Sequence, residues 1–129
     1  MNTVAISIGS NIEPDANVKR ACDLLSHYCE VVKTSAFVTT KPIGYANQPD
    51  FVNGAVLVKT SRSPENLTSL LHALERKLGR TRTTNKFGPR TIDLDILAWN
   101  GMIVDRDYYS RGFLINALQE IWPELNSHG

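Results

Sequence analysis

The sequence predicts an α+β domain in which strands and helices follow one another in the order β-α-β-β-α-β. Segments rich in β-branched residues recur along the chain, two segments with helical apolar spacing lie between them, and turn-forming residues separate these elements. A chain of 129 residues, 42% of them hydrophobic, has the usual size of one domain and enough apolar side chains to bury a core. We therefore expect a single domain over residues 1–129.

The first half of the chain contains three predicted strands and one predicted helix. Residues 3–8 alternate apolar and polar side chains, as a half-buried strand does, and the Gly-Ser-Asn triplet that follows ends the strand. Apolar residues recur at helical spacing over 15–28, which predicts an amphipathic helix. Residues 29–39 and 51–60 are rich in β-branched and aromatic side chains and predict two more strands. The loop between them, 40–50, contains two prolines and a glycine.

The second predicted helix carries signals at both of its ends. Ser63 can cap the N-terminus, Pro64 suits the first helical position, and Glu65 interacts favourably with the positive end of the helix dipole. Gly79 can adopt the left-handed conformation that ends a helix. One apolar stripe runs between these signals and is formed by Leu67, Leu70, Leu71, Leu74 and Leu78.

The last part of the chain completes the order of elements. After a polar loop over 80–89, residues 91–99 predict a strand, Gly101 turns the chain, and residues 113–122 predict a short final helix. The order β-α-β-β-α-β is that of a ferredoxin-like sandwich, in which two helices cover one face of an antiparallel sheet. We therefore expect an α+β, ferredoxin-like fold with a short additional helix at the C-terminal end.

Composition and cysteine spacing exclude several classes of protein. The chain has no run of about eighteen apolar residues that would predict a membrane span, and its first residues lack the features of a signal peptide. Cys22 and Cys29 favour free thiols in a reducing compartment over a disulfide framework, and they lack the spacing of a zinc site. We expect a cytoplasmic protein that acts as a monomer.

Basic residues gather in one segment. Residues 76–90 contain six of the fourteen lysines and arginines and no acidic residue, whereas the whole chain has a formal net charge of only +1. A local positive charge on a nearly neutral chain indicates an anionic ligand, although a solvated helix end and loop would show the same pattern. Nucleic acid is a weaker interpretation, because the chain has no second basic segment and no aromatic-rich strand of the kind that binds RNA.

Two aspartates lie in the otherwise apolar strand predicted over 91–99. Asp93 and Asp95 share one face of this strand, because side chains two residues apart point the same way. The opposite face points to the core and carries Ile92, Leu94 and Ile96. Carboxylates held so close repel each other unless a cation lies between them, and Mg²⁺ suits such a pair of oxygen ligands. Exposed carboxylates paired with Arg or Lys are the alternative interpretation.

Arginines precede this pair in the sequence. Arg90 comes three residues before Asp93, and Arg80 and Arg82 lie in the loop ahead of it. Guanidinium groups and Mg²⁺ on one sheet face can hold a polyphosphate and stabilise a phosphoryl group during its transfer. The chain has no Walker A loop and no kinase glycine-rich loop, and its Gly-Ser-Asn triplet signals only a turn.

Four segments together resemble a known enzyme family: GPRTIDLDIL at 88–97, SIGSN at 7–11, QPDFVNGAV at 48–56 and RGF at 111–113. The family is that of the 6-hydroxymethyl-7,8-dihydropterin pyrophosphokinases of folate biosynthesis, and the resemblance covers nearly the whole chain. It implies a ferredoxin-like enzyme that transfers the terminal pyrophosphoryl group of ATP to the pterin hydroxymethyl oxygen, giving AMP and the pterin diphosphate. It also implies two Mg²⁺ ions and small-molecule substrates, with no nucleic acid and no membrane as partners.

The resemblance assigns roles to individual residues. Asp93 and Asp95 match the aspartates that hold the metal ions. Arg80 and Arg90 match the arginines that stabilise the transferring group. The residues that match the nucleotide site are Arg82, Lys86, Ile96 and Arg111. The residues that match the pterin site are Thr40, Ile43, Phe51, Asn53 and Phe113.

The pterin-site residues have a chemistry that fits such a role. Phe51 and Phe113 would sandwich the flat ring by offset stacking, and Asn53 would read the amide-like edge of the pterin, because a carboxamide donates and accepts at once. Without the resemblance, the two rings are typical of core aromatics, and Asn53 is typical of a bulge or turn.

One segment departs from the family pattern. The family normally carries a Pro-His segment ahead of Arg-Gly-Phe, and that His contacts the nucleotide, whereas this chain has the shorter MIVDRDYYSRGF at 102–113. None of the three histidines, His27, His72 and His128, is placed to align with it. An alternative function is therefore a catalytically weakened paralogue that binds pterin or nucleotide in a regulatory or partner-binding role. The retained arginines, aspartates and pterin-site residues favour the active enzyme, because a module without catalysis does not need them all.

Overall fold

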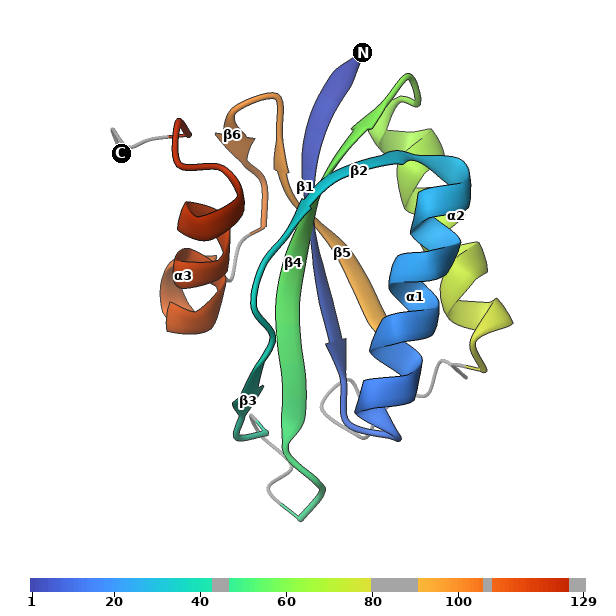
Figure 1. Ribbon diagram of the computed structural model, residues 1–129, viewed down its shortest axis with the longest axis vertical. Coiled ribbons are helices and arrows are strands. Elements are labelled where there is room, and N and C mark those ends of the chain that lie inside the picture. The colour runs from blue at the N-terminus through green and yellow to red at the C-terminus, as the bar shows by residue number, and fades with distance from the viewer. Residues whose placement is uncertain (43–46, 80–90, 106–107, 126–129) are drawn as a thin grey trace.

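The computed structural model of the chain describes residues 1–42, 47–79, 91–105 and 108–125. The predicted order of strands and helices is found, with one predicted strand divided in two and a short strand and a 3₁₀ helix added (Figure 1). The elements are β1 (Asn2–Ser10), α1 (Pro14–Tyr28), β2 (Glu30–Thr34), β3 (Val38–Thr40), β4 (Phe51–Thr60), α2 (Pro64–Lys77), β5 (Asp93–Trp99), β6 (Met102–Ile103), the 3₁₀ helix η1 (Tyr108–Ser110) and α3 (Gly112–Ile121).

The described strands form one antiparallel sheet. Its order is β2-β4-β1-β5-β6, and β3 pairs with β4 beyond the end of β2. β1 lies between β4 and β5 and is antiparallel to both. This arrangement of the four main strands is that of a ferredoxin-like sandwich, so the predicted fold class is confirmed.

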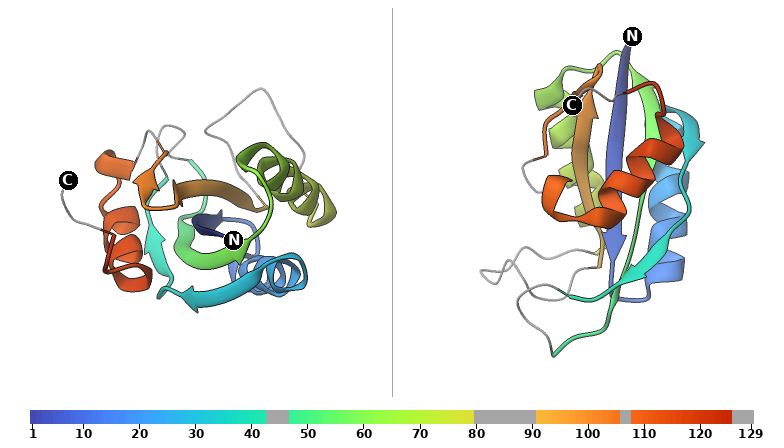
Figure 2. Two further views of the ribbon diagram at one scale, coloured as in Figure 1. Left: turned by 90° about the horizontal axis from the view of Figure 1, so that it is seen from above. Right: turned by 90° about the vertical axis from the view of Figure 1, so that its left-hand side faces the viewer.

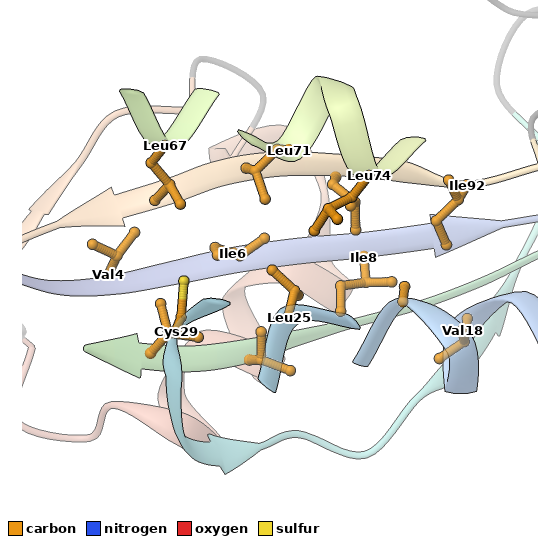
Figure 3. Close-up of a cluster of buried hydrophobic side chains, with 14 of the residues drawn as sticks. Val4, Ile6, Ile8, Val18, Leu25, Cys29, Leu67, Leu71, Leu74 and Ile92 are labelled. Carbon is orange, nitrogen blue, oxygen red and sulfur yellow. The ribbon is translucent and has the colours of Figure 1, made fainter. Parts of the chain in front are cut away.

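Helices α1 and α2 cover one face of the sheet (Figure 2). Alternate residues of β1, Val4, Ile6 and Ile8, point to this face and are at most 1% exposed. Figure 3 shows them in one cluster with side chains of both helices, among them Leu25 and Leu71. Each fully buried side chain of this kind contributes about 1.5–3 kcal/mol, so this first core cluster stabilises the pairing of both helices with the sheet.

The end signals of α2 act as the sequence predicts. The Ser63 hydroxyl accepts a hydrogen bond from the N–H of Asn66 at 3.1 Å, and the helix begins at Pro64. Gly79 follows the helix with a φ of +96°, in the left-handed region that glycine adopts most easily.

Helix α3 packs on the opposite face of the sheet (Figures 1 and 2). It buries Leu114, Leu118 and Ile121 in a second core cluster. The sheet residues of this cluster include Ala5, Ala55, Leu57, Leu97 and Ala98. The predicted C-terminal helix thus adds a third layer to the sandwich.

The strand predicted over 29–39 is divided into β2 and β3. Between them, Ser35 exchanges two hydrogen bonds of 2.9 Å with Ala55: its N–H donates to the Ala55 carbonyl, and its hydroxyl accepts from the Ala55 N–H. The next N–H, that of Ala36, donates to the Glu120 carboxylate of α3 at 3.0 Å. Side-chain oxygens therefore replace backbone carbonyls here, and the regular ladder stops.

Cys22 and Cys29 are free thiols, as the sequence predicts, and burial raises the pKa of both. Within the described ranges, no helix has the length and apolar character needed to cross a bilayer.

Candidate functional site

A cleft of about 740 Å³ opens on the α3 side of the sheet. Its lining comes mainly from β1, β3, β4 and β5 and from the beginning of α3, with one residue each from α2 and η1, Thr68 and Ser110. The predicted site residues found in the lining are Thr40, Phe51, Asn53, Asp93, Asp95, Ile96, Arg111 and Phe113. The others, Ile43, Arg80, Arg82, Lys86 and Arg90, lie outside the described residues. The structure therefore brings together all the predicted site residues that it describes, while their roles stay predictions.

Asp93 and Asp95 share the cleft face of β5. They pair with Gly9 and Ser7 of β1, and these small residues leave the space above the sheet open. Leu94 between the aspartates is 1% exposed and belongs to the first core cluster on the opposite face. The predicted alternation along this strand is confirmed at these positions.

Ile96 lies at the border of two environments. It packs against the first core cluster, as its position in the strand predicts, and it also lines the cleft. The register between β1 and β5 shifts at this level, between Ala5 and Ile6. Beyond the shift, Leu97 and Ala98 both belong to the second core cluster.

The electrostatics of the aspartate pair favour a cation. The pKa of the Asp95 carboxyl is raised from 3.8 to about 7, first because the surrounding protein displaces water, and then because the charges of Asp93 and Glu75 repel it. The Asp95 side chain is nevertheless exposed to the cleft. A cation that enters the cleft can reach this carboxylate and relieve the repulsion.

Asn53 is held in one orientation. Its Nδ2 atom donates a hydrogen bond to Thr40 Oγ1 at 2.5 Å. Asn53 pairs with Gly9 across the β1–β4 ladder, and a Cβ atom at Gly9 would lie 2.5 Å from Asn53 Oδ1. Glycine at this position therefore gives the carboxamide room to lie over β1. Because Asn53 lies inside a regular strand, its interpretation as a bulge or turn residue is wrong.

Phe51 and Phe113 line the cleft from β4 and from α3. Both rings are half-buried, and Phe113 also packs against the edge of the second core cluster. A core ring would be fully covered, whereas these rings keep part of their surface open to the cleft. Such surfaces suit stacking against a planar ligand.

Several residues of this region were not predicted from the sequence, and three of them bear on the chemistry of the site: Gly9, Glu75 and Asp105. Gly9 and Asp105 line the cleft, and Glu75 is buried behind it on α2. A signal for Glu75 exists in the sequence, because it lies four residues after Leu71 and three before Leu78, on the apolar stripe of the helix. A charged residue at such a position is unusual.

These features define a class of protein: a ferredoxin-like enzyme whose cleft places aromatic rings and a carboxamide near a pair of carboxylates. Such a site suits a planar small molecule on one side and a cation with its anionic ligand on the other. Comparison with known proteins gives the family. Residues 5–123 match the model of the family described as 7,8-dihydro-6-hydroxymethylpterin-pyrophosphokinase (HPPK), and the chain belongs to this family.

Individual relatives agree with this assignment. The chain is 38% identical to the 2-amino-4-hydroxy-6-hydroxymethyldihydropteridine pyrophosphokinase of Bacillus subtilis, over 97% of this chain and 81% of that protein. It is 35% identical to the protein of the same name from Haemophilus influenzae, over 97% of this chain and 84% of that protein. The protein of the same name from Pseudomonas aeruginosa is 34% identical over 95% and 82%. The family that the four sequence segments resemble is confirmed.

Proposed function

We propose that this chain is an ATP-dependent pyrophosphokinase that acts on 6-hydroxymethyl-7,8-dihydropterin in folate biosynthesis. The pterin hydroxymethyl oxygen attacks the β-phosphorus of ATP, and the bond from this phosphorus to the oxygen shared with the α-phosphate breaks. AMP leaves with that oxygen, the hydroxyl proton passes to solvent, and the product is the pterin diphosphate. The observation that carries the proposal is that predicted metal, nucleotide and pterin residues line one cleft, in a chain of this family.

The pterin occupies the part of the cleft lined by β3, β4 and α3. Phe51 and Phe113 stack on its faces, and Asn53 bonds to its amide-like edge. Thr40 orients Asn53, because its hydroxyl oxygen accepts a hydrogen bond from Asn53 Nδ2 and so fixes the direction of the carboxamide. Ile43, outside the described residues, contributes backbone hydrogen bonds.

Mg²⁺ fits the aspartate pair. Asp93 and Asp95 offer hard carboxylate oxygens on one strand face. The repulsion between them contributes to the raised pKa of Asp95, and a bound cation would reduce this repulsion. In the part of the chain that the structure describes, no three His, Cys, Asp or Glu side chains gather as metal ligands. Water and phosphate oxygens would fill the remaining positions, as is usual for Mg²⁺. Two ions bound here would neutralise charge on the triphosphate.

The nucleotide lies against the remaining residues of the cleft. Ile96 offers apolar surface and Arg111 a guanidinium group. Arg82 and Lys86 bind ATP, while Arg80 and Arg90 stabilise the charge that develops on the transferring pyrophosphoryl group. These four basic residues belong to the proposal through the family pattern, since they lie outside the described residues.

A catalytically weakened paralogue is the second candidate. It is favoured by the segment ahead of Arg111, where Asp105 lines the cleft and the expected histidine is missing. The negative charge of Asp105 raises the pKa of Asp95 further. The same negative charge repels a triphosphate and so opposes its binding in this part of the cleft.

An assay of AMP release separates the two candidates. The protein is incubated with 6-hydroxymethyl-7,8-dihydropterin, ATP and Mg²⁺, and a reaction without pterin is the control. We expect AMP that depends on the pterin. Pterin binding without AMP release would favour the weakened paralogue, and binding of neither substrate would contradict both candidates.

The oligomeric state and the compartment of the protein can be proposed from its cleft and its cysteines. We propose that the protein acts as a cytoplasmic monomer, because both cysteines are free thiols, as is usual in a reducing compartment, and because the predicted pterin and metal residues that the structure describes gather in one cleft of a single domain. Sedimentation equilibrium at the concentrations used in the assay measures the oligomeric state, and an active dimer with an inactive monomer would contradict this.

A further inference from the structure

Glu75 is a buried carboxylate that lies behind the aspartate pair. It belongs to the last turns of α2, and its side chain is 2% exposed. Its Oε2 atom accepts a hydrogen bond from the backbone N–H of Leu94 at 2.9 Å. Leu94 stands between Asp93 and Asp95, so this bond holds the backbone at the centre of the pair.

The bond acts on one edge of β5. β1 pairs with the other edge, and among the described residues β6 reaches β5 only at Ala98 and Trp99. Successive N–H groups of a strand point to opposite edges, and the N–H of Leu94 is one that points away from β1, because it donates to Glu75 of α2. Glu75 therefore occupies the position where a further strand would provide a carbonyl. An N–H without a partner there would leave this end of β5 less firmly fixed.

The choice of a carboxylate at this position needs a physical reason. A buried carboxylate is costly to remove from water, and an apolar residue on the α2 stripe would avoid that cost. A charged acceptor, however, makes a shorter and stronger hydrogen bond than a neutral one. Glu75 thus fixes the strand more rigidly than a packing residue could, at the one place where two aspartates must keep their spacing.

We propose that Glu75 is a positioning residue for Asp93 and Asp95. It fixes the backbone of Leu94 from the helix side of the sheet and so holds the two carboxylates at the spacing that shared metal ions require. The inference rests on the proposed metal role of the aspartates. It gives α2 a part in the reaction, although Glu75 lies behind the strand and not in the cleft.

Three variants test this role. Glu75→Leu removes the acceptor at similar volume, and Glu75→Gln keeps a neutral and weaker acceptor. Glu65→Gln is the matched control, because Glu65 is an exposed carboxylate in the first turn of the same helix. Circular dichroism and thermal unfolding establish which variants fold.

The first readout uses no ligand. Hydrogen–deuterium exchange of the Leu94 amide, followed by NMR, reports on the bond itself. We expect exchange to be about tenfold faster in Glu75→Leu and about threefold faster in Glu75→Gln, beyond any change that follows from global stability. The amide of Val58, in the middle of the sheet, is the internal reference and should follow global stability alone.

The second readout is the affinity for Mn²⁺ with a non-hydrolysable ATP analogue, measured by titration calorimetry. We expect Glu75→Leu to weaken it about tenfold and Glu75→Gln less, with no change in Glu65→Gln. Pterin affinity should stay the same in all three variants. In the two Glu75 variants kcat should fall while the KM for the pterin is unchanged, and in Glu65→Gln both constants should be unchanged.

The outcomes separate the inference from the proposed function. Unchanged Leu94 exchange and unchanged Mn²⁺–nucleotide affinity in folded Glu75→Leu would overturn the positioning role. If that variant does not fold, the same result in Glu75→Gln overturns it. Absence of Mn²⁺-dependent nucleotide binding in the unchanged protein would instead overturn the metal role of the aspartates, and the positioning role with it.

Discussion

Replacing Asp95 by Asn should raise the free energy of unfolding of the metal-free protein at neutral and higher pH. The Asp95 carboxyl has a pKa of about 7 in the folded chain and an ordinary value of 3.8. Between these pH values the unfolded state has released the proton and the folded state still holds it, so the free energy of unfolding falls as pH rises through this window. Asn does not titrate, and it removes this loss.

The size of the effect follows from the same pKa values. A difference of about 3 pH units corresponds to about 4 kcal/mol if it is fully expressed. Asp95 is exposed to solvent in the cleft, and screening by water reduces this figure, so we expect about 1–2 kcal/mol above about pH 8. The difference between the two proteins should become small near pH 4 and vanish below it, because the carboxyl is then protonated in both the folded and the unfolded state.

Urea unfolding in EDTA at several values between about pH 4 and pH 8.5 measures this difference. Asp23→Asn, which removes an exposed carboxylate of α1, is the control for loss of one negative charge. Mg²⁺ should then stabilise the unchanged protein more than Asp95→Asn, and the variant should release no AMP. Parallel pH profiles of the two proteins, or lower stability of Asp95→Asn above pH 8, would refute the reasoning.

Three further substitutions test other parts of the structure. Gly9→Ala should raise the KM for the pterin about tenfold and leave the KM for ATP unchanged, because its Cβ would lie 2.5 Å from Asn53 Oδ1; equal changes in both constants would contradict this. Arg90→Ala should lower kcat more than it weakens ATP binding, as kinetics and nucleotide titration together measure, and a change confined to the Kd for ATP would show a binding role only. Leu71→Ala should lower the free energy of unfolding in urea by about 2–5 kcal/mol, and an equal loss in the half-buried Leu70→Ala would contradict the placement of the core.

Local signals predict much of the fold. α2 begins and ends where Ser63, Pro64 and Gly79 indicate, because helix caps depend on residues that are neighbours in the sequence. The division of the strand predicted over 29–39 has no such local cause. It depends on the hydroxyl of Ser35, which bonds to Ala55 of β4, and on the carboxylate of Glu120, which reaches the strand only after α3 has packed against the sheet.

The candidate site likewise combines features that follow from local sequence with features that depend on how distant elements pack. Strand alternation alone places Asp93 and Asp95 on one face, because the apolar residues Leu94 and Ile96 alternate with them in the sequence. Phe51 and Phe113, by contrast, meet at the cleft only because α3 packs opposite α1 and α2, and a periodic pattern does not say which face of a sheet a third helix covers. The resemblance to a family supplied these two residues. The part played by Gly9 depends on a side chain of the neighbouring strand, which no local pattern reveals.

β1 is the strand on which both faces of the sheet depend. Val4, Ile6 and Ile8 fill the core under α1 and α2, while Ser7 and Gly9, in alternation with them, form the floor of the cleft. A slip of one residue in the pairing of β1 would exchange the two sets, with isoleucines in the cleft and serine and glycine in the core. An insertion or deletion in this strand would therefore destroy stability and ligand binding together. The variation that β1 can accumulate over evolution is limited to substitutions that keep its length.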